Sequence, residues 1–252
     1  MNEDYELLKK RFSELARKSD TQSYFTFTNF LGLAEQSAFF ELKPKLSGIS
    51  YSAFGGADSA ERVVIRFGNA DEIGYEAPFP IVTVKAEPVS QKFADKLTHR
   101  DFLGALLNLG IDRSTLGDIV IIDNVGYIFA LEDIAPYIVS SLTRVKHTDM
   151  KLSITDTLPD GDMYRTEQKK IQANGERLDA VIAKVFSLSR EDAQSLFKKR
   201  LVFASGRLIE STSYIPKENE VISVRGHGRM IYRGYESLSK KGKLNIVVDV
   251  YV

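Results

Sequence analysis

The 252-residue sequence contains no cysteine and only three histidines, His99, His147 and His227. The lack of cysteine excludes disulfides, thiolate zinc sites and a cysteine nucleophile, and it agrees with a reducing compartment. Three scattered histidines also argue against a histidine-rich metal site. We therefore expect no bound metal and no cofactor.

Long hydrophobic runs are also missing. The longest apolar stretch, IVIIDNVGYIFAL, is interrupted by Asp123, Asn124 and Gly126, which makes it too short and too broken for a membrane helix. The first residues, MNEDYELLKKRF, are charged and have no apolar signal core. We expect a cytoplasmic protein without a membrane span, long enough for about two domains.

The sequence has no net charge, but its charges are unevenly distributed. Residues 1–168 carry 18 Lys/Arg and 25 Asp/Glu, a net charge of −7, whereas residues 169–243 carry 16 Lys/Arg and 8 Asp/Glu, a net charge of +8. A basic module beside an acidic body indicates a polyanionic partner that binds to the basic module. The alternative is a basic face that is merely solvated.

Hydrophobic periodicity predicts an α+β protein. The N-terminal region is mostly helical, with a helix expected from Asn29, as its N-cap, to Leu42. The middle follows the order β-α-β-β-α-β, which is the ferredoxin-like arrangement that many RNA-recognition domains use. A polar stretch with proline and glycine then predicts a linker. The predicted boundaries are 1–75 for the helical region with a strand, 76–155 for the ferredoxin-like domain, 156–170 for the linker and 171–252 for a C-terminal module that ends in a strand.

Two features of the middle domain bear on function. His99-Arg100-Asp101 resembles part of a kinase catalytic loop, but Leu106 stands where that loop needs asparagine. Thr98 and Asp101 are better explained as a helix cap, which leaves His99 and Arg100 exposed at a helix start that favours phosphate. The aromatic pair Tyr127 and Phe129 partly matches the base-stacking motif of RNA-recognition domains, but the first strand has no aromatic. We expect both rings to point inward; the alternative is that one of them stacks on a base.

The C-terminal module carries the clearest pattern. Residues 177–186 predict a helix with one apolar face, and Ser189 with Asp192 predicts the capped start of a second helix. A small sheet follows. The polar side of this unit carries Arg177, Lys184, Arg190, Lys198, Lys199, Arg200 and Arg207.

The motifs E-R-L-D, S-R-x-x-A, S-G-R and I-S-V-R-G-x-G-R, in this order, resemble the S4 RNA-binding domain, which is of the αL-like type. Upstream, THRDFLGALLNLGI resembles the YlmH-type S4 proteins, so the resemblance covers nearly the whole chain. It implies RNA contacts by Arg177, Arg190, Arg225 and Arg229. The chain departs from the S4 pattern at Arg200, Ser205 and Asn219, three turn positions.

Some S4 proteins are pseudouridine synthases with a catalytic aspartate in R-L-D, which makes Asp179 a candidate. Only 73 residues follow it, too few for such a catalytic domain, so we expect a binding protein and not an enzyme. The resemblance implies structured RNA as partner, namely rRNA of the large ribosomal subunit or tRNA, and rescue or quality control of stalled complexes. A scaffold linked to cell-division proteins is the alternative.

Overall fold

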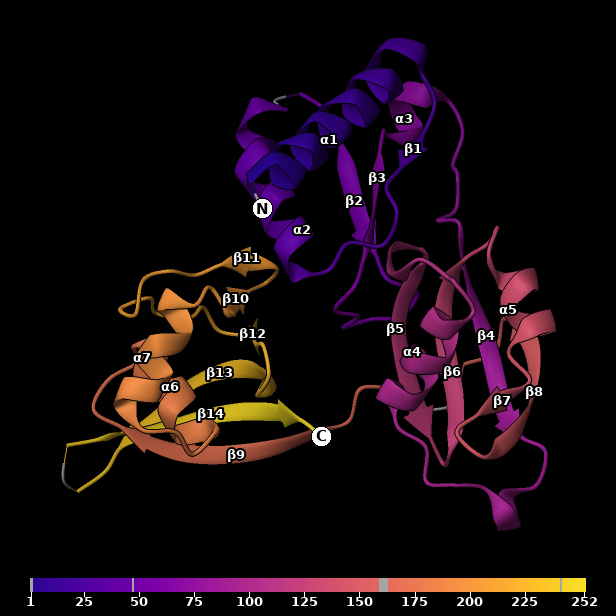
Figure 1. Cartoon of the computed structure of the whole chain (residues 1–252). Coiled ribbons are helices and arrows are strands. Elements are labelled where there is room, and N and C mark those ends of the chain that lie inside the picture. Colours follow the sequence, from indigo (N-terminus) through magenta and orange to yellow (C-terminus); the bar gives the residue numbers. More distant parts are fainter. Residues whose placement is uncertain (1, 47, 159–162, 241) are drawn as a thin grey trace. The chain divides into compact units, whose positions relative to one another are not determined.

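The computed structural model describes residues 2–46, 48–158, 163–240 and 242–252. The fold is α+β, and the chain divides into two compact units, unit 1 (Met1–Met163) and unit 2 (Tyr164–Val252), shown in Figure 1. The predicted linker 156–170 needs a correction, because residues 166–170 belong to strand β9. Residues 159–162 of that linker lie outside the described residues.

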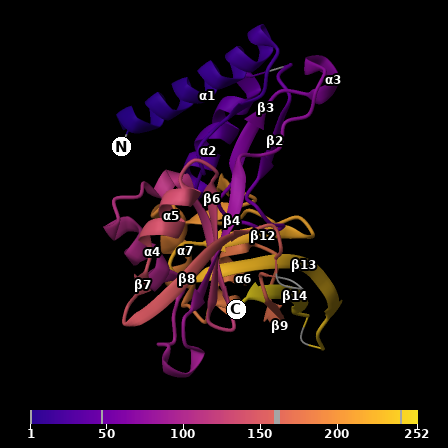
Figure 2. The same cartoon turned by 90° about the vertical axis from the view of Figure 1, so that its right-hand side faces the viewer.

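The N-terminal part of unit 1 contains more strands than predicted. Helices α1 and α2 lie beside each other against a three-stranded sheet of order β1-β3-β2 (Figure 2). Phe12, Phe39 and Phe67 lie at the centre of this core. The elements are α1 (Asn2–Gln22), β1 (Thr26–Phe27), α2 (Leu33–Leu42), the 3-10 turn η1 (Lys43–Lys45), β2 (Tyr51–Phe54), β3 (Val64–Phe67) and α3 (Ala70–Ile73).

The predicted helix start at Asn29 is wrong. Helix α2 begins at Leu33 after an N-cap at Gly32, while the Asn29 amide donates to the Ser114 hydroxyl at 3.0 Å. Leu31 instead forms an antiparallel bridge with Val63. Long-range pairing thus competes successfully with the local capping preference.

The middle part of unit 1 has the predicted element order. Its sheet has the order β5-β6-β4-β8-β7, and α4 and α5 cover one face, where they bury Phe102, Leu106 and Ile138 (Figure 1). The elements are β4 (Ile81–Pro88), η2 (Gln91–Phe93), α4 (His99–Asn108), η3 (Arg113–Thr115), β5 (Leu116–Ile122), β6 (Val125–Leu131), α5 (Ala135–Ser141), β7 (Arg144–Val145) and β8 (Thr148–Thr155).

Two turns shape this sheet. The Asp123-Asn124 pair between two apolar stretches predicts a hairpin. The two residues take φ values of 51° and 65°, which confirms it, because residues with left-handed backbones close two-residue hairpins. The sequence RVKHTDMKLSI, residues 144–154, predicts one strand. It is split into β7 and β8 because Lys146, with a φ of 52°, turns the chain back.

The N-terminal and middle parts of unit 1 are joined by hydrogen bonds. The Asp118 carboxylate of β5 accepts the backbone N–H of Glu61 at 2.7 Å and that of Arg62 at 3.1 Å. The backbone N–H of Phe30 donates to the carbonyl of Ser114 at 2.8 Å. The N-terminal part therefore packs directly on the middle domain.

Unit 2 is two short helices on one face of a six-stranded sheet of order β11-β10-β12-β13-β14-β9 (Figure 1). Leu178, Ile182 and Phe197 of the helices meet Ile222, Met230 and Ile246 of the sheet. The elements are β9 (Thr166–Ala173), α6 (Leu178–Val185), α7 (Arg190–Lys198), β10 (Val202–Ala204), β11 (Arg207–Leu208), β12 (Glu220–Val224), β13 (Gly228–Leu238) and β14 (Leu244–Tyr251).

The three turn positions that depart from the S4 pattern keep left-handed backbones. Arg200, Ser205 and Asn219 have φ values of 58°, 46° and 65°. Asparagine adopts this conformation readily, whereas arginine does so at a cost. The turns therefore persist although these three residues depart from the S4 pattern.

Candidate nucleic-acid interface

The start of α6 is organised around one buried carboxylate. The Asp179 side chain is 0% exposed and accepts hydrogen bonds from the Nε and Nη2 atoms of Arg177, each at 3.1 Å. Gln194 of α7 donates to the same carboxylate at 3.0 Å. Asp179 therefore ties the two helices together and fixes the plane of one guanidinium.

A second guanidinium faces the same carboxylate. The Nε atom of Arg190, the first residue of α7, lies 3.9 Å from an Asp179 oxygen, and its side chain is 64% exposed. Arg177 is 44% exposed. One buried acid thus holds two arginines whose side chains are partly exposed to solvent, an arrangement suited to phosphate oxygens.

Asp179 stays ionised in this setting. Burial alone would raise the pKa of its carboxyl, but the hydrogen bonds from Gln194 and Arg177 outweigh it and hold the pKa below the ordinary value. The negative charge of Asp179 is therefore stabilised by Arg177 and Gln194 within the protein.

A pocket of about 360 Å³ opens beside these arginines. Four cationic residues line it, and the described residues of its lining include no carboxylate. Apolar side chains such as Ala180, Ala183 and Leu188 form part of its wall. The cationic residues are Arg177, Lys184, Arg190 and Lys243; we call them the pocket cations.

Lys243 was not among the predicted site residues. It precedes β14, whose Leu244 pairs with Ala173 of β9, and this register places Lys243 beside the loop that leads into α6. The basic run KKGK at 240–243 was visible in the sequence. Only the pairing of β9 with β14 assigns it to this pocket.

The other predicted cations of unit 2 are distributed more widely. Lys198, Lys199 and Arg200 are exposed at the far end of α7, about 12 Å of helix from Arg190. Arg200 pairs with Glu210 at 3.3 Å, and Arg207 is exposed on β11.

Arg225 and Arg229 do not join the pocket cations. Arg225 lies over the Phe203 ring at 5.3 Å, and Arg229 lies over the Tyr251 ring at 4.5 Å. Phe203 sits between two core residues of β10, so it faces away from the helices because side chains alternate along a strand. The four arginines of the S4 motif are therefore divided between two faces of unit 2.

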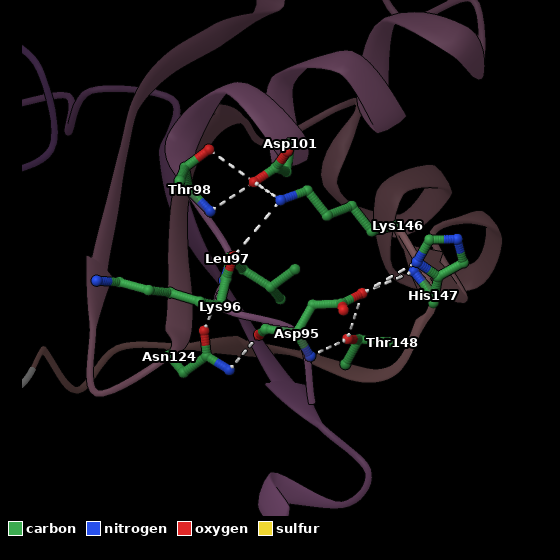
Figure 3. Close-up of polar contacts among 9 residues, drawn as sticks. All are labelled: Asp95, Lys96, Leu97, Thr98, Asp101, Asn124, Lys146, His147 and Thr148. Atoms are coloured by element: carbon green, nitrogen blue, oxygen red, sulfur yellow. Dashed lines mark hydrogen bonds and ion pairs between the residues drawn. The ribbon is translucent and has the colours of Figure 1, made fainter. Parts of the chain in front are cut away.

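In the middle domain, the predicted cap of α4 is confirmed. The Asp101 carboxylate accepts the Thr98 backbone N–H at 2.8 Å and the Thr98 hydroxyl at 2.6 Å, and Lys146 lies 2.9 Å from it (Figure 3). These contacts with Thr98 and Lys146 lower the pKa of Asp101 to about 2. His99 and Arg100 are exposed, as expected, but an ionised carboxylate already occupies the helix start.

A polar network holds the loop before α4 in place (Figure 3). Asn124 accepts the Leu97 N–H and donates to the Asp95 carbonyl, each at 2.9 Å. Asp95 receives the backbone N–H of His147 at 3.1 Å and donates its own N–H to Thr148 at 2.9 Å. Lys146 is therefore fixed at a turn that faces α4.

RNA-recognition domains stack bases on aromatic side chains of one sheet face, but in this domain the two aromatic side chains of that motif are buried. Tyr127 is 8% exposed and Phe129 is 0% exposed, which confirms the predicted inward packing. Gly56, with a φ of 97°, lies so close to the Phe129 ring that an added Cβ would sit 2.3 Å from it. The N-terminal part of unit 1 thus covers Phe129.

Among the described residues, no helix combines the length and the apolarity needed to cross a bilayer. Within the described ranges, no group of three or more histidine, aspartate or glutamate side chains is placed so that it could hold a metal ion.

Residues 78–158 match the family model described as "Putative RNA-binding domain in YlmH". The chain is also 29% identical over 213 residues to ribosome-associated protein quality control protein P2 of Bacillus subtilis (strain 168), an alignment that covers 80% of this chain and 77% of the relative. The chain is similar to YlmH-type proteins. Among solved structures, the chain is similar to the cell division protein ylmH from Streptococcus pneumoniae, with a TM-score of 0.48 and 20% identity, over 60% of this chain and 91% of that one.

Proposed function

We propose that this protein binds structured RNA through the helix-bearing face of unit 2 and acts on ribosomal complexes by binding, not by catalysis. The observation that carries the proposal is the buried Asp179, which holds Arg177 and Arg190 at a pocket whose described lining is cationic and free of carboxylates. Guanidinium groups held in this way can each offer two N–H groups to phosphate oxygens.

The finer assignments belong to the same proposal. The two helices and the sheet of unit 2, together with the sequence motifs, support an S4 module. The strand order of the middle part supports a ferredoxin-like domain. The name of the Bacillus subtilis relative supports a ribosomal partner and a role in quality control. We infer that the RNA is rRNA of the large subunit or tRNA, and that the protein acts in the cytoplasm.

The main test uses Arg190→Ala, since Arg190 is exposed and its loss leaves Asp179 paired with Arg177 and Gln194. Each phosphate contact adds about 0.7–0.9 to the slope of log K against log salt. The variant should bind large ribosomal subunits and a generic RNA hairpin several-fold more weakly, with a slope lower by about one. Binding is measured by co-sedimentation and filter assays at several salt concentrations.

Lys217→Ala serves as the matched control, because Lys217 is exposed and does not line the pocket. It should bind like wild type. If Arg190→Ala binds like wild type while ribonuclease treatment leaves its partners attached, the RNA-binding proposal fails and the division-linked scaffold replaces it.

The proposal that the protein acts without catalysis has its own test. Asp179 is engaged by Arg177, Gln194 and the Ala180 N–H, which supports a structural role. Wild-type protein incubated with rRNA or tRNA should yield no new pseudouridine by mass spectrometry after nuclease digestion. Its formation would contradict the assignment.

A further inference from the structure

The middle domain has a groove on its helical face that the proposed function of unit 2 does not use. Its volume is about 610 Å³, and it runs along α4 beside the segment that joins α5 to β7. Arg100, Gly104 and Asn108 follow one another at four-residue spacing on α4, so they form one stripe along the groove. Thr143, Arg144 and Lys146 line it from the other segment.

Gly104 is the feature that the fold itself does not explain. It lies in the interior of a ten-residue helix, where glycine destabilises relative to alanine. Apart from the backbone of its own helix and its two chain neighbours, no atom of the described residues lies within 4 Å of the position that a Cβ would take there, so no neighbour requires its absence. A glycine in such a place lets a ligand approach the helix backbone closely.

The charges of the groove indicate an anionic ligand. Three cationic residues line it, and the acid of the described lining, Asp101, is already paired with Lys146 at 2.9 Å. Arg144 contacts Asp149 at 3.3 Å, but both side chains are more than half exposed, and exposed pairs of this kind are weakly held. Arg100 is exposed beside them.

We propose that this groove binds the sugar-phosphate backbone of an RNA strand, with phosphates at Arg100, Arg144 and Lys146 and the ribose chain passing over Gly104. The proposal rests on the RNA-binding function proposed above and adds a second contact surface in unit 1. It favours RNA over an acidic peptide because the domain matches a family described as RNA-binding, while its aromatic pair is closed to bases.

The network of Figure 3 shows how the fold prepares this surface. Asn124 and Asp95 fix the loop before α4, and Asp95 also receives the N–H of His147. The Lys146 side chain extends from its turn to Asp101 at the start of α4 (Figure 3). Lys146 is therefore held at the edge of the groove before any ligand arrives.

The test uses the full chain, large ribosomal subunits and an RNA hairpin labelled with 4-thiouridine. Arg100→Glu and Gly104→Leu should each weaken hairpin binding about three- to ten-fold, and Arg100→Ala should lower the salt slope by about 0.7–0.9. Photo-crosslinks to the tryptic peptide 101–113 should be present in wild type and lost in Gly104→Leu, while crosslinks to unit 2 remain.

Two further variants control for folding and for charge. Gly104→Ala should raise the melting temperature by about 1–3 °C, since alanine favours the helix, yet it should weaken crosslinking at 101–113. Lys92→Glu reverses an exposed charge outside the groove and should leave these crosslinks unchanged.

The outcomes separate the two proposals. If peptide 101–113 gives no crosslink in wild type, or crosslinks equally in Gly104→Leu, the groove proposal is overturned. A loss of binding with Arg190→Ala would then still support the function of unit 2. If only the groove variants lose RNA, the groove stands and the assignment of unit 2 fails.

Discussion

The two cationic surfaces of this protein are organised in different ways. In unit 2, one buried carboxylate, Asp179, lies against both Arg177 and Arg190, whose side chains remain 44% and 64% exposed. In the middle domain, Lys146 and Arg144 pair with acids at the surface itself. A buried acid orients cations without competing for their ligand, whereas a surface acid must be displaced or shared. We therefore expect unit 2 to provide most of the affinity.

The largest effect should come from removing the buried acid. Asp179→Ala leaves Arg177 and Gln194 without their shared acceptor, and α6 loses its tie to α7. The free energy of unfolding of unit 2 should fall by about 2–3 kcal/mol, measured by urea denaturation with hydrogen exchange in α6 and α7. Glu191→Ala, an exposed change on the same helix, should stay within about 0.5 kcal/mol. Equal effects of the two changes would show that Asp179 does not join the helices.

The next effect compares the two faces of unit 2. Lys243→Ala removes a pocket cation, so RNA affinity should fall several-fold and the salt slope by about one. Arg229→Ala removes a cation that lies over Tyr251 on the other face, so affinity should change less while thermal stability falls. Both are measured by salt titration of the RNA hairpin and by melting. A larger affinity loss with Arg229→Ala would move the interface to the opposite face.

A smaller effect concerns the turn after α7. Arg200 has a φ of 58°, a conformation that costs arginine more than glycine. Arg200→Gly should raise the stability of unit 2 by up to about 1 kcal/mol, less what is lost with the exposed contact to Glu210. Asn219→Gly should change little, because asparagine already tolerates this geometry. Destabilisation by Arg200→Gly in denaturant melts would show that the Glu210 contact outweighs the backbone cost.

The smallest expected effect is a pH dependence of stability that concerns the middle domain and not unit 2. The folded pKa of Asp101 is lowered to about 2 by Thr98 and Lys146, below its unfolded value of about 3.9. Its stabilising contribution is therefore complete above pH about 4 and is lost as the pH falls toward 2. Wild type and Asp101→Asn should differ in hydrogen exchange of α4 at pH 5 and converge near pH 2. A constant difference over this range would contradict the cap's dependence on ionised Asp101.

Features set by nearby residues could be predicted from the sequence. Thr98 with Asp101 and Ser189 with Asp192 cap helices where expected, since both partners lie within one turn. The hairpin at Asp123-Asn124 is equally local. The helix from residue 177 was placed correctly to within one residue at each end.

Features set by distant pairing could not be predicted. Strand β9 reads as a polar linker because most of its side chains are exposed at the edge of the sheet. Strands β1 and β2 are short and become recognisable only beside β3. For the same reason, the place of Lys243 at the pocket depends on the register of β9 with β14.

That register has a mechanical consequence. Thr166, the first residue of β9, pairs with Tyr251, the last residue of β14, and the Val252 N–H donates to the Arg165 carbonyl just outside them at 3.1 Å. A pull on the two ends of unit 2 would load these bonds one after another, as in a zipper, and not all at once. The unit should therefore open at low force from the Arg165–Val252 end, with β9 peeling away while α6 and α7 still cover the other strands.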